Sequence, residues 1–308
     1  MDKVLLTGAT GYIGHNLTAR LAATGWQVHI LVRPESDARR ANTATARHIY
    51  DGGTESVLAA VAAAKPDVVF HLAGLVKRAH AVQDVEAIVG ANVLLGAQVL
   101  EAMAATSCRI LVNAGTYWEY DTEGHYAPNS LYAATKRAFQ DLIVFYVRFH
   151  RLRAITLILF DVYGPSDWRG KLIPSLVAKV RAGKPMPATG GEQRVDLVYI
   201  DDVTDGFMRA AALLREEGAN ASGHRVFALD TGRRLKVKEV AAVLETVAGR
   251  HLDVRWGELP YRDNQIFEPK LATEILPGWS PKVPLEEGLR RVLATTPETR
   301  GLERLAES

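Results

Sequence analysis

Tyr132 and Lys136 form a pair whose spacing could support acid–base chemistry. They are four residues apart in a segment whose pattern predicts a helix, so both side chains would lie on one face. A phenol has an ordinary pKa of about 10. At neutral pH it therefore needs a nearby positive charge to stabilise its anion. The pair predicts a tyrosine that exchanges a proton beside an activating lysine.

A glycine-rich loop near the start of the chain could bind phosphate. Gly8 and Gly11 would let the backbone turn sharply and approach a pyrophosphate, whose charge the free N–H groups of a helix start would bind. Gly14 would let that helix pack closely on a sheet. The order strand, loop, helix predicts a dinucleotide site, with a tight turn that binds nothing as the alternative. The residues expected to bind are Gly8, Thr10, Gly11, Tyr12, Ile13 and Gly14.

Arg33 follows the second predicted strand and bears on which dinucleotide binds. A site for NAD usually places a carboxylate there, on the ribose 2′-hydroxyl, but here the first carboxylate is Glu35. A guanidinium suits a 2′-phosphate instead. We therefore expect NADP(H). NAD(H) is the alternative if Arg33 is an ordinary solvated residue.

The elements that must position these residues alternate along the first half of the chain. Hydrophobic runs predict strands at 4–7, 28–32, 67–71, 109–113 and 155–160. Helical spacing predicts helices at 13–24, 55–64, 84–105 and 130–150. Strands that are apolar on both faces and separated by helices are typical of a parallel sheet covered on both sides. This predicts an α/β fold with a doubly wound Rossmann sheet.

The alternation of predicted strands and helices ends after Pro165, where prolines divide the sequence into shorter segments. We expect residues 1–165 to form the cofactor-binding domain and residues 166–308 to form mainly a smaller substrate-binding lobe. Strands near 195–200 and 225–229 are candidates to return to the first sheet. The expected helix 130–150 has two apolar stripes, which predicts a homodimer through this helix, or else its burial under the chain's own C-terminal lobe.

Composition excludes several classes of protein. Of 308 residues, 48% are hydrophobic, which is too many for a disordered chain. The 37 Lys and Arg against 35 Asp and Glu give a net charge of +2, so no bulk field favours nucleic acid or an anionic membrane. A lone cysteine, Cys108, with no secretory signal and no long apolar run fits a cytoplasmic protein. The histidines show no metal-ligand spacing, so we expect no metal.

Four motifs occur in a familiar order. They are the glycine loop, His71-Leu72-Ala73-Gly74, Tyr132-Ala133-Ala134-Thr135-Lys136 and Val162-Tyr163-Gly164-Pro165. Together they resemble the extended short-chain dehydrogenase/reductase family of sugar-nucleotide epimerases, dehydratases and ketoreductases. The resemblance runs from residue 3 to about residue 290.

The resemblance implies a role for each matching residue. Tyr132 would be the general acid or base, Lys136 would bind the nicotinamide ribose and lower the pKa of the tyrosine, and Thr116 would hydrogen-bond the substrate oxygen. Asp51 would receive the adenine amino group, with a solvated turn residue as the alternative. Further positions implied at the cofactor are Gly52, Leu72, Ala73, Gly74 and Asn92.

The resemblance also implies substrate contacts. Arg169 and Lys171 lie in a loop that would meet a diphosphate, with Leu172 beside them. Arg262 resembles an arginine that clamps the nucleotide diphosphate, and Arg194 stands one place before another such position. Asp161 stands where many relatives have asparagine, and it would contact a sugar hydroxyl or an arginine.

The expected reaction follows from two positions and the cofactor. The family's dehydratases carry Asp-Glu directly after the catalytic hydroxyl residue, whereas this chain has Tyr117 and Trp118, so dehydration is disfavoured. Arg33 favours exchangeable NADPH and hence net reduction. The resemblance of Leu159-Phe160-Asp161 and Gly191-Glu192-Gln193 favours the branch that makes CDP- or dTDP-linked deoxysugars. We therefore expect reduction of a CDP- or dTDP-linked 4-keto-6-deoxyhexose, with Tyr117 among the substrate contacts. The alternatives are a redox-neutral 4-epimerase and a non-catalytic NADP-binding sensor or scaffold.

Overall fold

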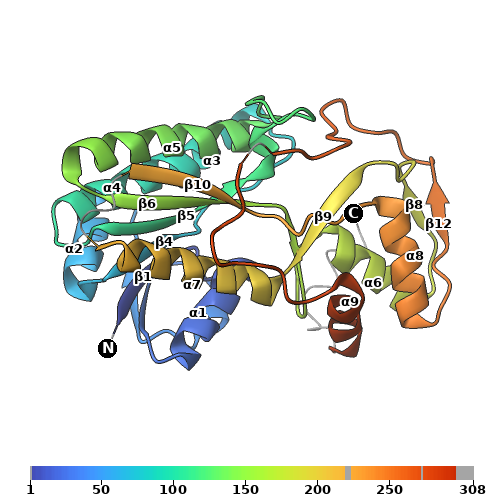
Figure 1. The fold of residues 1–308 in the computed structure, drawn as a ribbon, viewed down its shortest axis with the longest axis horizontal. Helices are drawn as coiled ribbons and strands as arrows, with labels where there is room; N and C mark the ends of the chain where they lie inside the picture. The colour runs from blue at the N-terminus through green and yellow to red at the C-terminus, as the bar shows by residue number, and fades with distance from the viewer. Residues whose placement is uncertain (1, 219–222, 272, 296–308) are drawn as a thin grey trace.

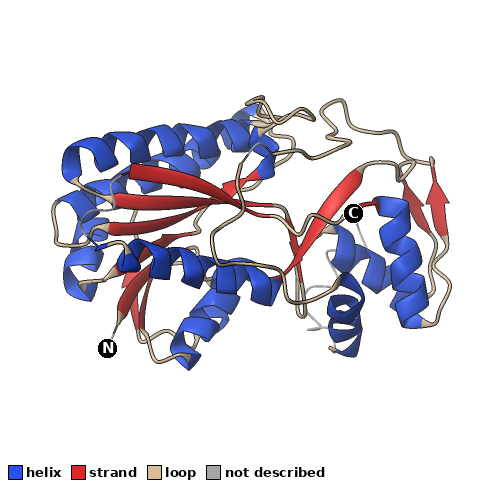
Figure 2. Ribbon diagram, viewed as in Figure 1, coloured by secondary structure: helices blue, strands red, loops and turns tan. Residues whose placement is uncertain are grey.

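A seven-stranded parallel sheet organises the first part of the computed structural model, which describes residues 2–218, 223–271 and 273–295. Its strand order is β10-β6-β5-β4-β1-β2-β3, and every neighbouring pair is parallel. The strands are β1 (Lys3–Thr7), β2 (Gln27–Val32), β3 (Ala46–Ile49), β4 (Val68–His71), β5 (Ile110–Thr116), β6 (Arg153–Leu159) and β10 (Gly223–Leu229). The predicted doubly wound α/β fold is confirmed (Figure 1; Figure 2).

Helices cover both faces of this sheet, because alternate residues of each strand face opposite layers. On one face Leu6 of β1 packs with α1 (Tyr12–Ala23) and α7 (Ile200–Glu216). On the other face Leu5 packs in a second core, beneath the remaining helices. These are α2 (Thr54–Ala64), α3 (Val85–Val89), α4 (Leu95–Ala104) and α5 (Leu131–His150). Figure 1 shows α3 and α5 on one side of the sheet and α1 and α7 on the other.

Two elements of this domain differ from expectation. Strand β3 was not predicted, because its alternating exposed and half-buried residues give it no continuous apolar run. The helix expected at 84–105 contains a π-helical segment, η3 (Gly90–Leu94), between α3 and α4. By length and composition the stretch Val82–Ala104 could cross a membrane, yet half of its apolar window is buried inside the protein. A π-helical segment inside a helix often marks a functional position.

A second set of elements forms around a three-stranded sheet of order β11-β9-β7. Its strands are β7 (Asp161–Tyr163), β9 (Arg194–Tyr199) and β11 (Arg234–Lys236). A two-stranded sheet lies beside it, and three helices pack nearby (Figure 1). The two-stranded sheet consists of β8 (Met186–Ala188) and β12 (Val254–Trp256). The three helices are α6 (Leu172–Ala182), α8 (Val237–Ala248) and α9 (Leu285–Ala294).

The two strands considered as returning to the first sheet behave differently. Strand β10 pairs with β6 along its whole length and is the edge of the seven-stranded sheet. The strand expected near 195–200 is β9, and it does not return. The chain leaves the first sheet after β6, and β7 takes β9 as its parallel partner while β11 pairs with β9 on the other side. The division at residue 165 stays a prediction.

Helix α5 buries only one of its two apolar stripes. Phe139 and Ile143 are fully buried against the sheet. Phe145 and Phe149 are 49% and 63% exposed. The described part of the C-terminal lobe therefore does not cover this outer stripe, contrary to one of the two expectations for it.

Candidate active site

The glycine loop is built so tightly that side chains are excluded from it. Gly8 has a φ of 75°, and its carbonyl accepts the N–H of Gly11 at 3.0 Å. A Cβ on Gly14 would lie 2.1 Å from the Gly8 carbonyl oxygen, and a Cβ on Gly8 would lie 2.6 Å from the Ala73 nitrogen. The loop thus needs glycine at both positions, where the helix and the loop after β4 approach β1 most closely.

The start of α1 presents unpaired donors. The helix begins at Tyr12, its N-cap Gly11 offers no side-chain cap, and its first turn, which includes Ile13, holds no acidic residue. Such a terminus attracts an anion through its N–H groups and the helix dipole. Together with the preceding turn at Thr10, it fits the pyrophosphate of a dinucleotide. The Tyr12 hydroxyl donates to the Pro165 carbonyl at 3.0 Å and ties this end to the segment after β7.

The loop after β4 is held by its neighbours on both sides. The Ala73 N–H donates to Thr7 Oγ1 at 3.2 Å, and the Leu75 N–H donates to Asn92 Oδ1 at 2.7 Å. Asn92 is fully buried in η3, and its amide also donates to Thr135 Oγ1 of α5 at 2.9 Å. Asn92 therefore fastens the cofactor loop to the helix that carries Tyr132 and Lys136.

Gly74 is less tightly confined, since a Cβ there would lie 3.1 Å from the side-chain oxygen Oδ1 of Asn92. Leu72 precedes it, and its N–H donates to the Thr7 carbonyl at 3.2 Å. The backbone of this loop thus contacts the carboxyl end of β1, beside the glycine turn.

Arg33 and Asp51 follow paired strands and so lie at one edge of the sheet. Arg33 is exposed, and its Nε is 3.1 Å from Glu35 Oε1. Asp51 Oδ1 accepts the Gly53 N–H at 2.8 Å, and this bond, with the Ser56 hydroxyl, holds the pKa of Asp51 below its usual range. Gly52, between Asp51 and Gly53, has a φ of 101°. The Arg33 guanidinium is thus exposed and paired with Glu35, and the Asp51 carboxylate bonds within its own turn.

Thr116, Tyr132 and Lys136 converge at the end of β5 and the start of α5. The Ser130 hydroxyl caps α5 by accepting the Ala133 N–H at 3.2 Å, which fixes the first turn where Tyr132 lies. Burial raises the pKa of Tyr132, and a hydrogen bond with the Thr116 side chain opposes this rise. Burial lowers the pKa of Lys136 to about 8. The lowering of the Tyr132 pKa that the resemblance implies for Lys136 is not seen here, because burial and the charge of Glu119 raise it.

Glu119 is a buried acid that the sequence reasoning missed. It is 0% exposed, Oε1 accepts the Thr116 N–H at 3.2 Å, and Oε2 accepts Gln140 Nε2 at 2.6 Å. Burial raises the pKa of this carboxyl to about 7. The sequence held a usable signal, because Thr116-x-x-Glu119 has the pattern of a capping box, which forms here around a short 3₁₀ turn.

Arg169 and Lys171 differ in their surroundings. Arg169 Nε is 2.8 Å from Asp167 Oδ1, and its NH2 group donates to the Val162 carbonyl at 2.9 Å. Arg169 is thereby bound within the chain. The Lys171 ammonium lies 5.2 Å from the centre of the Trp118 ring, and burial lowers its pKa. Leu172 is the first residue of α6 and places Lys171 at the N-cap of that helix.

A second cation, Arg78, also packs on Trp118 and was not predicted. Its guanidinium lies 4.7 Å from the ring centre. Arg262 is exposed, and burial together with the positive charge of Arg78 lowers its pKa. Arg78, Lys171 and Arg262 thus lie in one positive region. The carboxylates that act on Lys171 there are Asp161 and Asp167.

Asp161 is tied to the residue after Thr116. The Tyr117 hydroxyl donates to Asp161 Oδ2 at 3.0 Å, and the Tyr117 ring stacks on Phe160 at 5.1 Å. The two side chains predicted to meet substrate therefore bind each other at the base of the positive region.

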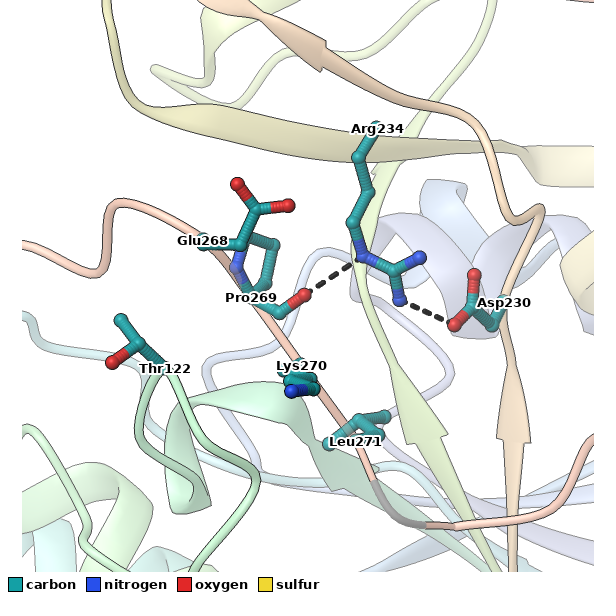
Figure 3. A pocket seen from close by; sticks show the side chains of 7 residues that line it. All are labelled: Thr122, Asp230, Arg234, Glu268, Pro269, Lys270 and Leu271. Atoms are coloured by element: carbon teal, nitrogen blue, oxygen red, sulfur yellow. Dashed lines mark hydrogen bonds and ion pairs between the residues drawn. The ribbon is translucent and has the colours of Figure 1, made fainter.

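Arg194 lies beside a pocket of about 430 Å³. It donates to the Arg234 carbonyl at 2.9 Å and pairs with Glu268 at 3.1 Å. Figure 3 shows Arg234 joined to Asp230 and to the Pro269 carbonyl on the pocket wall. None of the predicted site residues lines the pocket, whose walls are Thr122, Asp230, Arg234, Glu268, Pro269, Lys270 and Leu271.

Within the part of the chain that the structure describes, no three His, Cys, Asp or Glu side chains are grouped to hold a metal ion. The single cysteine, Cys108, is buried, and burial raises the pKa of its thiol to about 11. A thiol of this kind is a poor nucleophile. Cys108 is therefore not a candidate nucleophile.

Comparison with known proteins gives the same picture. Residues 4–224 match the family model described as NAD dependent epimerase/dehydratase family. The chain is 29% identical over 297 residues to CDP-abequose synthase of Salmonella muenchen, covering 95% of this chain and 97% of that protein. It is 28% identical over 318 residues to UDP-glucose 4-epimerase of Mycolicibacterium smegmatis, covering 94% and 97%. The UDP-glucose 4-epimerase of Thermus thermophilus, solved as a complex with NAD, has a TM-score of 0.78 and 25% identity, covering 94% and 97%.

Proposed function

This chain belongs to the NAD-dependent epimerase/dehydratase family, and from that premise we propose that it reduces the 4-keto group of a CDP- or dTDP-linked 6-deoxyhexose with NADPH. The observation that carries the proposal is that Tyr132 hydrogen-bonds the Thr116 side chain, with Lys136 one helical turn away, while Asn92 ties this helix to the loop after β4. The similarity to a protein named for a CDP-linked sugar supports this substrate class. The similarity to UDP-glucose 4-epimerases supports the second candidate, redox-neutral epimerisation.

The chain's own residues would hold the cofactor at both ends. The N–H groups at the start of α1 bind the pyrophosphate, and Arg33 binds a 2′-phosphate. Lys136 binds the nicotinamide ribose. A reduced nicotinamide, when bound, supplies hydride to the carbonyl carbon.

The proton comes from Tyr132. As negative charge develops on the substrate oxygen, the Tyr132 hydroxyl donates its proton to that oxygen, and the Thr116 hydroxyl donates a hydrogen bond to it. The ammonium of Lys136 stabilises the resulting phenolate. The raised pKa of Tyr132 suits a residue that must arrive protonated. Tyr117 and Trp118 provide no carboxylic acid for loss of water.

The substrate's diphosphate has a suitable partner in the positive region formed by Arg78, Lys171 and Arg262. Charge-assisted hydrogen bonds from such groups to phosphate are about twice as strong as neutral ones. Asp161, already bonded to the Tyr117 hydroxyl, can accept from a sugar hydroxyl nearer the reacting carbon.

The test is to incubate the protein with CDP- and dTDP-4-keto-6-deoxyglucose and NADPH and to follow the absorbance of reduced nicotinamide. Stoichiometric consumption is the expected result. Isomerisation of a nucleotide sugar without consumption would establish the epimerase instead. If neither occurs while NADPH still binds, the protein is a sensor or scaffold.

The choice of NADPH rests on Arg33 and is tested separately. An Arg33→Ala variant should lose about tenfold in affinity for NADPH and little for NADH, because only the 2′-phosphate loses its partner. Arg39→Ala is the matched control, since this nearby exposed arginine is paired with Asp37. Equal loss for both nucleotides would contradict the assignment.

A second copy of this chain is the proposed partner of the outer face of α5. Phe145 and Phe149 on α5 and Leu94 on the neighbouring η3 are each about half exposed or more. A patch of this kind is self-complementary across a twofold axis. Light scattering at micromolar concentration should give the mass of a dimer, and a monomeric mass would exclude it.

A cytoplasmic location remains part of the proposal, supported by the single buried thiol.

A further inference from the structure

The buried carboxyl of Glu119 has a place in the site that the reaction described above does not use. Its two oxygens accept from donors on two different elements, the Thr116 N–H at the end of β5 and Gln140 Nε2 on α5. Both partners are donors, so this arrangement suits the carboxylate rather than the protonated acid. When ionised, a carboxylate held in this way is a negative charge fixed in position inside the protein.

That charge faces the reacting groups of α5. Tyr132, Lys136 and Gln140 are spaced four residues apart, so they follow one another along a single face of the helix. Glu119 is fixed at the third of these positions by its bond to Gln140 and interacts electrostatically with both Tyr132 and Lys136. Charges interact strongly at such a buried place because little water screens them.

Other charged groups around Glu119 are few. The cations that act on it are Lys136 and Arg137, both on α5, and its charge also acts on the Tyr120 phenol at the end of the 3₁₀ turn. Arg137 pairs at 3.8 Å with Asp141 on the same helix. Lys136 is the only one of these cations that the reaction uses.

We propose that Glu119 is the buried counter-ion that keeps protons on Tyr132 and Lys136, and so sets the pH range in which the site can deliver a proton. A negative charge opposes loss of a proton from the phenol, which would create a second anion, and from the ammonium, which would remove its partner. Both effects favour the acid form of the site, which reduction requires. Glu119 cannot change the equilibrium of the reaction, but it extends the pH range in which Tyr132 is a proton donor. This role deepens the proposed reductase function and rests on it.

Glu119→Gln removes the charge and keeps the shape. The new amide oxygen can still accept the Thr116 N–H, and Gln140 can turn its amide so that its Oε1, which lacks a partner among the described residues, accepts the new N–H. The matched control is Glu101→Gln, because Glu101 accepts a hydrogen bond from a tyrosine of the same helix, Tyr146, at 2.6 Å but lies away from the site.

Two measurements separate this role from a structural one. In the protein labelled at the tyrosine ζ-carbon, the NMR signal of Tyr132, assigned by its loss in Tyr132→Phe, should show an inflection near pH 7 as Glu119 titrates. The inflection should vanish in Glu119→Gln and remain in Glu101→Gln. In the pH profile of kcat for NADPH-dependent reduction, the apparent pKa of the alkaline limb should be about one unit lower in Glu119→Gln and unchanged in Glu101→Gln.

The inference is overturned if the unmodified protein shows no inflection of the Tyr132 signal near neutral pH, a result that does not depend on any variant folding. It is also overturned if the alkaline limb of Glu119→Gln stays in place, or moves equally in Glu101→Gln. The NMR titration needs no substrate. If the protein reduces no nucleotide sugar and the inflection is present, the proposed reaction fails while the role of Glu119 stands.

Discussion

The start of α5 and the loop after β7 both carry polar residues expected to act on a ligand, but the chain holds them differently. Tyr132 and Lys136 are placed by helix geometry and have no ion pair that fixes them elsewhere among the described residues. In the loop, Arg169 is bound to Asp167 and to the Val162 carbonyl. Groups placed on one helix face by regular backbone geometry remain available for a ligand, whereas the loop cation Arg169 is paired with a carboxylate that folds beside it.

Tyr132→Phe tests the first half of this comparison and has the largest expected effect. Turnover should fall by about a thousandfold, within the usual range for removal of a general acid. NADPH affinity should stay nearly unchanged, because the proposed cofactor contacts lie mainly at the glycine loop. Turnover is measured by NADPH consumption and affinity by cofactor fluorescence. Surviving turnover would show that another group supplies the proton.

Gly14→Ala tests whether backbone geometry alone prepares the cofactor site. The new Cβ would lie 2.1 Å from the Gly8 carbonyl oxygen, so the loop or the helix must move. Overpacking of this kind typically costs about 1–3 kcal/mol. NADPH affinity should fall by about tenfold to a hundredfold, as measured by titration calorimetry. Gly25→Ala is the control, since a Cβ there meets nothing within 4 Å, although its φ of 85° adds some strain.

The sequence predicted the parallel sheet and the glycine loop after its first strand well, because short-range rules govern both. Strand, loop and helix follow one another within Lys3–Ala23, and the glycine spacing has few structural uses other than close backbone approach. The Tyr132 and Lys136 spacing likewise depends only on helix periodicity. These positions could be placed before any tertiary contact was known.

Other positions depend on contacts between distant segments and could not be predicted in the same way. Arg194 was a candidate for the diphosphate, yet it pairs with Glu268, which is far away in the sequence. Arg78 joins the positive region only because the loop after β4 meets Trp118. Glu119 was passed over because a charged residue is expected at the surface. Of the two strands considered as returning to the first sheet, only β10 does, and nothing local reveals which sheet a strand will join.

Arg262→Ala and Arg169→Ala form a pair that sharpens the comparison within the substrate region. Loss of a charge-assisted bond costs about 1.5–3 kcal/mol. Arg262→Ala should therefore raise KM for the nucleotide sugar by about tenfold to a hundredfold and leave Tm unchanged. Arg169→Ala should lower Tm by several degrees, since Asp167 is left buried without its partner. If Arg169→Ala raises KM more than Arg262→Ala, the internal ion pair opens when substrate binds.

Asp196→Asn gives the smallest expected effect and tests the buried charges that join the two sheets. Asp196 on β9 is 1% exposed and accepts from the Thr231 hydroxyl at 2.8 Å, and burial together with the neighbouring Asp230 raises its pKa to about 7. A carboxyl with a raised pKa in the folded state favours folding when protonated. Its contribution is therefore complete below its ordinary pKa of about 4 and is lost as pH rises towards 7.

The unmodified protein should thus lose on the order of 1–2 kcal/mol of stability between about pH 4 and pH 7 that Asp196→Asn does not lose. Urea unfolding at several pH values measures this difference, and Asp141→Asn, at an exposed position of α5, is the control. An equal pH dependence in all three proteins would mean that Asp196 is charged in the fold. Hydrogen-bond donors would then stabilise the ionised Asp196 inside the protein, as the Thr116 N–H and Gln140 stabilise Glu119. The start of α5 and the loop after β7 would then differ only in how their exposed cations are paired.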